Sequence, residues 1–233
     1  MGKPETGSGL SQLRHQIEHC TTCARLRKHC LTIARDKRRA YLSDTYWGKP
    51  IVGFGDPEAQ LLIVGLAPAA HGANRTGRIF TGDRSGEWLF RALHKAGFSN
   101  QPVSIGPGDG LELKNAYITC VVRCAPPDNK PTPQELKKCA VYLETELELL
   151  APRTRVFVTL GQIALTALWP FLAPGKSRPK FSHGGRVELK TPQGKEITLL
   201  MSYHPSQQNT FTGRLTEPMF DSIFAAAKAL TSN

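Results

Sequence analysis

The sequence predicts a three-layer α/β/α fold with a mostly parallel central sheet. Short, continuous apolar runs are typical of strands that are buried on both faces, as parallel strands are. Segments with helical periodicity lie between these runs, and such alternation produces a sheet covered by helices on both sides. The strands are expected at residues 61–66, 116–122, 155–160 and 197–201. The helices are expected at residues 11–30, 85–97 and 133–150, from Gly161 onward, and at about 217–230.

Local signals set several of these boundaries. The segment TPQE at residues 132–135 has the pattern of a capping box with proline at the first helical position, so a helix should begin there. Residues 53–57, GFGDP, are expected to form a turn. Residues 1–10 are rich in glycine and serine without an apolar period and are expected to be a disordered tail. Residues 11–233 contain no clear linker or repeat and are expected to form a single domain.

The charge balance favours a polyanionic partner such as nucleic acid. The 233 residues include 30 Lys and Arg against 19 Asp and Glu, a formal net charge of +11. Residues 25–39 hold seven basic residues and one acid, which suits a phosphate-contacting surface that includes Arg38 and Arg39. A solvated helix face is the alternative explanation of the same pattern.

The cysteines suggest a metal site. No apolar run is long enough to span a membrane, and residues 1–16 lack the apolar core that a signal peptide has. A cytoplasmic protein without disulfides is therefore expected. Cys20 and Cys23 form a C-x2-C pair, and Cys124 and Cys139 follow the second predicted strand. Two pairs of soft thiolates suit zinc or an iron–sulfur cluster, and spacing alone does not separate these two. The alternative is that the cysteines are buried, inert thiols.

The predicted strands also locate the site. In open sheets of this class, ligands bind beyond the carboxyl ends of the parallel strands. The loops after Leu66, Val122 and Met201 all begin at such ends, so they should converge.

The chain closely resembles the family 5, or type B, uracil-DNA glycosylases in three segments. They are GLAPAAHGANRTGRIFTGD at residues 65–83, ITCVVRCAPPDNKP at 118–131 and HPSQQNTFTGRLT at 204–216. The resemblance runs from about Cys20 to the last predicted helix, and family 4 enzymes share the layout. It implies the uracil-DNA glycosylase fold and an enzyme of DNA repair.

The resemblance also implies a [4Fe–4S] cluster in place of zinc. The family's ligand pattern falls on four cysteines: Cys20, Cys23, Cys124 and Cys139. Nothing in base removal needs an electron, so the cluster should be structural. Cys30 and Cys120 fall outside the pattern. The resemblance implies that family 4 enzymes have an asparagine that reads uracil at the position of Cys120. The lack of that asparagine here resembles family 5, whose members accept a wider range of bases.

Three residues suit the chemistry of base removal, in which the sugar becomes positive and the departing base negative. The nucleotide must first leave the stack. Phe80 matches a family residue that stacks on the base, and an aromatic face suits any flat base. His204 follows a strand end and can donate a hydrogen bond to the developing negative oxygen. Asn129 can orient water or contact the base through its amide.

The water-activating residue is expected at Asp83, the first acid available in the first motif. A carboxylate there can polarise water and stabilise the cationic sugar, although Asp83 can instead cap the following helix. Asn74 is the neutral alternative for positioning water. The backbone from Gly65 through Ala67 to Ala69 can contact the base directly, and the small Ala69 side chain leaves room for a permissive pocket.

Residues 207–215 resemble the family's DNA-entry loop. Arg214 can reach a phosphate or the orphaned base, and Leu215 can wedge into the gap left by the flipped nucleotide, unless it packs inward. Thr210 and Thr212 offer hydroxyls to phosphate oxygens.

The sequence therefore predicts a monomeric, monofunctional DNA glycosylase. It should hydrolyse the N-glycosidic bond of uracil and other deaminated bases such as hypoxanthine, leaving an abasic site for base excision repair. The alternative, a non-enzymatic nucleic-acid-binding module with zinc, explains the charge and the cysteines but not Phe80, Asp83 and His204 at strand-end loops. A dinucleotide-binding enzyme is disfavoured because no G-x-G-x-x-G follows the first predicted strand.

Overall fold

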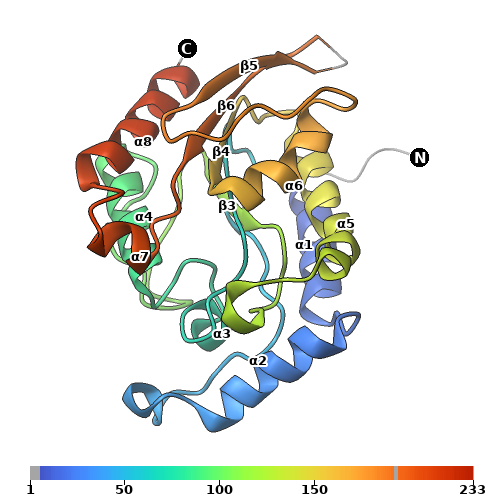
Figure 1. Cartoon of the computed structure of the whole chain (residues 1–233), viewed down its shortest axis with the longest axis vertical. Coiled ribbons are helices and arrows are strands. Elements are labelled where there is room, and N and C mark those ends of the chain that lie inside the picture. The colour runs from blue at the N-terminus through green and yellow to red at the C-terminus, as the bar shows by residue number, and fades with distance from the viewer. Residues whose placement is uncertain (1–5, 192–193, 233) are drawn as a thin grey trace.

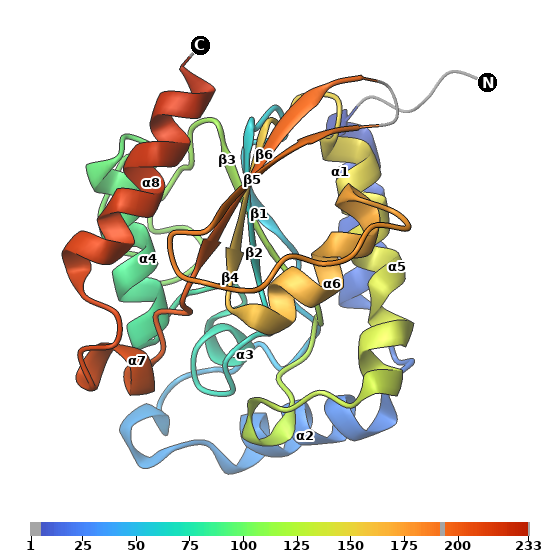
Figure 2. The same cartoon turned by 45° about the horizontal axis from the view of Figure 1, so that its top comes forward.

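The three-layer α/β/α fold is confirmed. The computed structural model describes residues 6–191 and 194–232 and places a six-stranded sheet between two layers of helices. Figure 1 and Figure 2 show one face of the sheet covered by α4 (Arg84–Lys95) and α8 (Glu217–Thr231). The other face is covered by α1 (Thr6–Glu18), α5 (Pro133–Leu150) and α6 (Gln162–Leu172).

The sheet has the strand order β1-β3-β2-β4-β6-β5. Its four parallel strands match the predicted ones: β2 (Leu61–Gly65), β3 (Ala116–Cys120), β4 (Val156–Leu160) and β6 (Glu196–Ser202). The edge strands β1 (Phe54–Gly55) and β5 (Arg186–Lys190) pair antiparallel and were not predicted. β1 has only two residues and lies within the predicted turn, and β5 has no buried residue, so neither shows a continuous apolar run.

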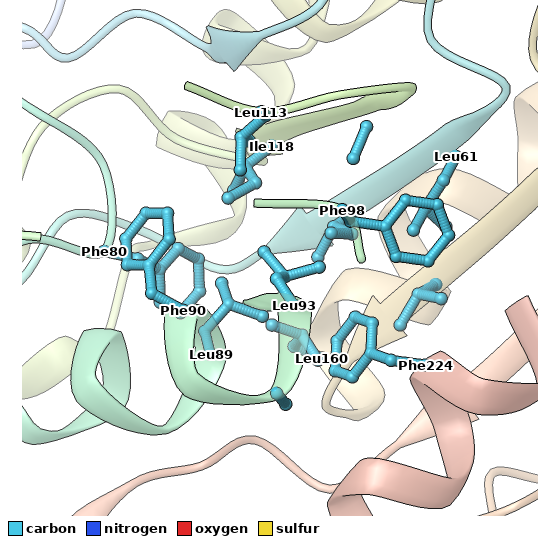
Figure 3. Packing of buried hydrophobic residues seen from close by; sticks show 14 of the residues in the cluster. Leu61, Phe80, Leu89, Phe90, Leu93, Phe98, Leu113, Ile118, Leu160 and Phe224 are labelled. Atoms are coloured by element: carbon cyan, nitrogen blue, oxygen red, sulfur yellow. The ribbon is translucent and has the colours of Figure 1, made fainter. Parts of the chain in front are cut away.

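The central strands are apolar throughout because both of their faces are buried. Every residue of β2 is buried, with Leu61 and Ile63 facing α4 and α8 while Leu62 and Val64 face α5 and α6. Figure 3 shows the first of these two cores, in which side chains of α4 and α8 meet those of the strands. Each large apolar side chain buried in this way contributes about 1.5–3 kcal/mol.

The amino-terminal region differs from the prediction. The helix expected at residues 11–30 is two helices, α1 and α2 (Ala24–Asp36), separated by the segment that carries Cys20 and Cys23. The tail expected at residues 1–10 is wrong for residues 6–10, which belong to α1, while residues 1–5 lie outside the described part of the chain. Leu13 and Ile17 are buried where α1 packs on α5, and this tertiary contact outweighs the poor helix propensity of the glycines.

Short elements gather beyond the carboxyl ends of the parallel strands. α3 (Ala73–Thr76) and α7 (Gln207–Phe211) lie within segments expected to be loops, and short 3-10 turns occur at Arg39–Tyr41 and Pro127–Asn129. α2 crosses beneath this edge of the sheet in Figure 2. Among the described residues, no helix is both long enough and apolar enough to cross a membrane.

Candidate active site

The strand-end loops converge, as predicted, on one cavity of about 910 Å³. Its walls come from the loop after β2, the 3-10 turn after β3, the loop after β6 and the turn that follows α2. Seven of the predicted site residues line it: Arg38, Ala67, Ala69, Phe80, Asp83, Asn129 and His204.

Phe80 and His204 form an aromatic pair in the cavity wall. Their ring centroids lie 5.8 Å apart, with an angle of 29° between the ring planes. Phe80 also lies against Gly65, because a Cβ atom at that position would be 2.9 Å from both Cε2 and Cζ of the phenyl ring. Gly65 itself does not line the cavity. Because it has no side chain, it leaves the space that the phenyl ring occupies.

The backbone of Phe80 is held in an unusual conformation. Its φ angle of 53° is in the left-handed region, which is rare for an aromatic residue and costs of order 1–3 kcal/mol. A Cβ atom at Gly86 would overlap the Phe80 carbonyl oxygen, so α4 can approach this turn only with glycine at that position. The first turn of α4 and the Phe80 segment are therefore packed directly together.

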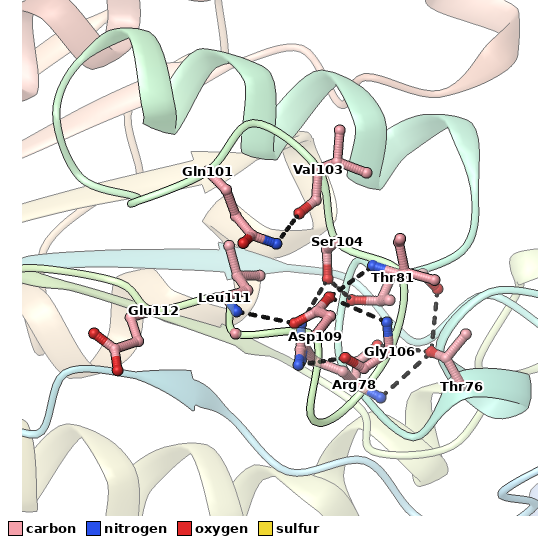
Figure 4. Close-up of polar contacts among 12 residues, drawn as sticks. Thr76, Arg78, Thr81, Gln101, Val103, Ser104, Gly106, Asp109, Leu111 and Glu112 are labelled. Carbon is pink, nitrogen blue, oxygen red and sulfur yellow. Dashed lines mark hydrogen bonds and ion pairs between the residues drawn. The ribbon is translucent and has the colours of Figure 1, made fainter.

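A buried ion pair beside Phe80 fixes the same segment (Figure 4). Arg78 Nη1 lies 2.9 Å from Asp109 Oδ1, and Arg78 also donates to the Gly106 carbonyl oxygen at 2.6 Å. Burial opposes ionisation of Asp109, but the amides of Leu111 and Ile105 and the Arg78 guanidinium lower its pKa to about 2. Asp109 therefore stays ionised, and Arg78 ties the cavity wall to the loop at 104–111.

Asp83 caps α4 and also lines the cavity, so its position is compatible with both roles that the sequence left open. It is the N-cap of α4, and its Oδ1 accepts a hydrogen bond of 3.0 Å from the Gly86 amide. It also lines the cavity, with Oδ2 against Gly72, where an added Cβ atom would overlap this oxygen. Burial raises the pKa of Asp83 above its usual value, although the Gly86 and Ser85 amides oppose the shift. The carboxylate is thus partly desolvated, as a general base should be.

His204 faces the cavity as a neutral imidazole. Burial lowers its pKa from 6.5 to about 4. Its carbonyl oxygen accepts hydrogen bonds of 2.8 Å from the Asn209 side chain and the Ser206 amide, which fix the turn. Neither ring nitrogen has a partner among the described residues, so the ring can donate to a ligand.

Asn129 lies on the opposite wall. It is exposed and, like Asp128 before it, has a left-handed backbone, with φ angles of 56° and 53°. Both residues line the cavity from the 3-10 turn, and no partner of the Asn129 amide group occurs in the described part of the chain. The amide is therefore available for water or a base.

Like Gly65, two further residues of the predicted site lie outside the cavity wall: Asn74 and Cys120. The buried Asn74 side chain donates to the Cys30 carbonyl oxygen at 3.2 Å, toward α2. Cys120 is 1% exposed in β3, and its Sγ donates to the Val122 carbonyl oxygen at 3.1 Å. Both side chains form hydrogen bonds with backbone carbonyl groups of the protein. A sequence motif does not show in which direction such a side chain points.

The DNA-entry segment is arranged differently from the prediction. Leu215 is completely buried in the core that faces α4 and α8, so the wedge expected there is wrong for this conformation. Phe211 at the end of α7 is 70% exposed instead, and the Arg84 guanidinium lies over its ring at 5.3 Å. The alternative that Leu215 packs inward is therefore correct.

The other residues of this segment are near the surface. The Thr210 and Thr212 hydroxyls donate to the Gln207 and Gln208 carbonyl oxygens, at 3.4 and 2.6 Å. Arg214 is exposed, and its guanidinium lies 4.6 Å from the centre of the Tyr203 ring. Arg214 can reach a phosphate from this position, whereas the threonine hydroxyls already have acceptors within α7.

The basic run at residues 25–39, which covers α2 and the start of the following 3-10 turn, contains both ion-paired and unpaired residues. Arg25 pairs with Glu135 at 2.7 Å, and Arg35 pairs with its neighbour Asp36 at 2.6 Å. Lys28, Arg38 and Arg39 are exposed and have no ion-pair partner among the described residues, and Arg38 lies on the cavity rim. These three cations form the strongest candidate phosphate-binding surface.

The four cysteines predicted as ligands lie in one neighbourhood. The thiol of Cys23 interacts electrostatically with Cys20 and Cys124, and that of Cys139 interacts with Cys23 and Cys124. Hydrogen-bond donors surround them: Arg123 N lies 3.3 Å from Cys139 Sγ, and Arg27 Nη1 lies 3.8 Å from Cys124 Sγ. In the described part of the chain, no three Cys, His, Asp or Glu side chains are close enough to hold a single metal ion.

Sequence reasoning missed several cavity residues. Tyr41, His71 and Arg84 line the cavity, and Tyr46 contacts His71 from behind. His71 stands within the first motif, so its position between Ala70 and Gly72 was a usable signal. Tyr41 and Tyr46 come from a segment without a recognisable pattern, and only the folded chain brings them to the site.

This cavity lies at the carboxyl edge of a parallel sheet, where open α/β sheets bind their ligands. The family model of the uracil DNA glycosylase superfamily matches residues 52–228, and the chain belongs to that superfamily. It is 49% identical to a type-5 uracil-DNA glycosylase of Mycobacterium tuberculosis over 96% of this chain and 83% of the relative. A Thermus thermophilus protein of the same description is 54% identical over 83% of this chain and 86% of its own. A type-4 uracil-DNA glycosylase of Archaeoglobus fulgidus is 32% identical over 67% and 70% of the two chains.

Proposed function

We propose that the protein is a monofunctional DNA glycosylase that hydrolyses the N-glycosidic bond of uracil and other deaminated bases, leaving an abasic site for repair. The observation that carries this proposal is the pairing of Phe80 with the neutral imidazole of His204 in one strand-end cavity. An aromatic face and a neutral hydrogen-bond donor together suit a flat base that leaves as an anion.

The reaction uses three walls of the cavity. Phe80 stacks on the extruded base, and His204 donates a hydrogen bond to the oxygen on which negative charge develops. Asp83 polarises the attacking water and stabilises the positive sugar. Asn129, on the opposite wall, orients that water or the base through its amide. The Gly86 amide bonds to Oδ1 of Asp83, and Oδ2 lies against Gly72, another residue of the cavity wall.

Two features support a broad range of bases. The Ala67 and Ala69 side chains in the cavity wall are small, so they leave room for a purine. Cys120 directs its Sγ to the Val122 carbonyl oxygen, so it supplies no side chain to read uracil alone. Hypoxanthine and xanthine should therefore be accepted in addition to uracil.

DNA is held by the surfaces around the cavity. Arg38, Arg39 and Lys28 contact phosphates on one side, and Arg214 does so on the other. Phe211 fills the gap that the extruded nucleotide leaves, because an exposed apolar side chain can occupy an unstacked step. The protein should act as a monomer, which sedimentation would test.

The four cysteines Cys20, Cys23, Cys124 and Cys139 are proposed to hold a [4Fe–4S] cluster. A zinc ion needs all four sulfurs about 2.3 Å from one point, and the separation of these thiols disfavours that arrangement. A four-iron cluster has one ligand on each iron and so accepts sulfurs that are farther apart. The cluster would connect the segment between α1 and α2, the loop after β3, and α5, and would thereby stabilise the fold.

The cluster proposal is tested by iron content. Cys124→Ser should lose bound iron and brown colour, and it should lower the unfolding temperature. Cys120→Ala is the matched control, because this cysteine is also buried but lies outside the ligand set. Equal iron in both variants would contradict the assignment.

The proposed activity is tested with one set of oligonucleotides that carry uracil, hypoxanthine or xanthine, as single and double strands. Alkali cleaves the strand wherever a base has been removed. Uracil and at least one deaminated purine should be released, whereas a panel in which no base is released would overturn the proposal.

A further inference from the structure

His71 occupies the cavity wall without a role in the reaction described so far. It stands in the loop after β2, half-buried, between the wall that carries Phe80 and the turn that carries Arg38 and Tyr41. Histidine at a cavity wall can bind a ligand or fill space, and its hydrogen bonds distinguish the two roles.

One ring nitrogen of His71 is already occupied. Its Nδ1 lies 2.9 Å from the Tyr46 hydroxyl oxygen, and Tyr46 is only 9% exposed. No other partner of this hydroxyl exists among the described residues. The buried phenol therefore donates its proton to Nδ1, since the opposite arrangement would leave the phenol proton without an acceptor. A neutral imidazole that accepts at Nδ1 has its hydrogen on Nε2.

The surroundings keep this imidazole neutral and fixed. Burial lowers the pKa of His71, and the nearby cations Arg38 and Arg75 and the ring of His29 lower it further. Arg75 also donates to the His71 carbonyl oxygen at 2.8 Å and pairs with Asp44 at 2.6 Å. The side chain and the backbone of His71 are thus both held in place.

We propose that His71 Nε2–H donates a hydrogen bond to a carbonyl oxygen of the extruded base and is a specificity-determining residue. The inference rests on the proposed glycosylase function and extends it to the choice of base. His71 and His204 come from different loops, so the two donors can address different oxygens of one base. No other described cavity residue offers a neutral donor whose hydrogen position is fixed by a buried partner.

The chemistry of deamination explains what such a donor would recognise. Deamination replaces an exocyclic amino group, which is a donor, with a carbonyl oxygen, which is an acceptor. A fixed N–H therefore accepts uracil but opposes cytosine, and accepts hypoxanthine but opposes adenine. A single donor would thus read deamination in pyrimidines and purines alike. It would not separate xanthine from guanine, because both have a carbonyl group at C6.

The test compares His71→Leu, which removes the donor, with His71→Gln, whose amide retains one. Single-turnover rate constants would be measured on uracil, hypoxanthine, cytosine and adenine. His71→Leu should reduce the rate constants for uracil and hypoxanthine by roughly 10- to 100-fold, the effect of one hydrogen bond to a charged group. His71→Gln should recover part of the loss. Tyr46→Phe removes the hydroxyl that holds the hydrogen of His71 on Nε2. It should cause a smaller decrease in the rate constants for the same two bases.

A second measurement separates base reading from DNA binding. Affinity for DNA that contains a stable abasic analogue should be the same for the wild type and for His71→Leu, because that ligand has no base. Thermal unfolding shows whether His71→Leu has a folding defect. If it has one, the rate constants of Tyr46→Phe and His71→Gln test whether His71 reads the base. Unchanged rate constants in His71→Leu, or equal losses for base-containing and abasic DNA, would overturn the inference. An inactive wild type would instead overturn the proposed function.

Discussion

Phe80 lies against His204 with 5.8 Å between the ring centroids, although 124 positions of chain separate the two residues. One residue follows β2 and the other follows β6, so the parallel sheet brings them together at its carboxyl edge. The pair places a stacking face beside a neutral hydrogen-bond donor. The geometry of Phe80 should therefore control activity more strongly than stability.

Gly65→Ala tests the support of this ring. The new Cβ would lie 2.9 Å from two atoms of the Phe80 ring, so the ring must move. We expect kcat/KM on uracil DNA to fall roughly 10- to 100-fold, because a displacement of about 1 Å can cost that much. Gly106→Ala is the control, since no atom lies within 4 Å of its added Cβ. Equal activity of the two variants would contradict the prediction.

Asp83→Asn separates catalysis from helix capping. Asparagine caps helices about as well as aspartate, so the free energy of unfolding should change by less than about 1 kcal/mol. The carboxylate is lost, however, and turnover should fall by roughly 100-fold or more. Asp83→Ala should lose the cap in addition, which chemical denaturation would detect. Full turnover in Asp83→Asn would show that this residue only caps α4.

The single-turnover rate constant should have an acid limb from protonation of Asp83 and no histidine inflection near pH 6.5. Burial raises the pKa of Asp83 above 3.8, so the rate constant should fall as the pH decreases through that raised pKa and the carboxylate is protonated. His204 has its pKa lowered from 6.5 to about 4, so it stays neutral near pH 6.5. A rate profile from mildly acidic to neutral pH should show no inflection near 6.5. Asp83→Asn should lose the acid limb.

Phe211→Ala and Leu215→Ala should have opposite effects. Phe211 is 70% exposed, so its removal should leave stability nearly unchanged and slow base removal from duplex DNA more than from single strands, which have no stack to fill. Leu215 is fully buried, and its truncation should destabilise the fold by about 2–5 kcal/mol. Denaturation and paired duplex and single-strand assays measure both effects. If Leu215→Ala is stable and base removal is slowed on duplex DNA alone, Leu215 and not Phe211 would be the residue that fills the gap in the stack.

The central strands were predictable because burial on two faces leaves a continuous apolar run. β2, β3 and β4 have this property, and their predicted ranges are close to the observed ones. β5 pairs along one side only and has no buried residue, so its sequence shows no such run. The break between α1 and α2 was missed because helical periodicity alone does not reveal where a chain leaves one helix for another.

The sequence by itself determined the layered fold, the edge of the sheet at which the loops converge, and the presence of Phe80, Asp83 and His204 in those loops. Strand burial and strand-end motifs are local in the chain, so they can be read without a structure. Only the tertiary structure decided that Leu215 is buried while Phe211 is exposed, and that the Tyr46 hydroxyl lies within hydrogen-bond distance of His71 Nδ1. The direction of a loop side chain depends on partners far away in sequence, and those partners are known only after the chain has folded.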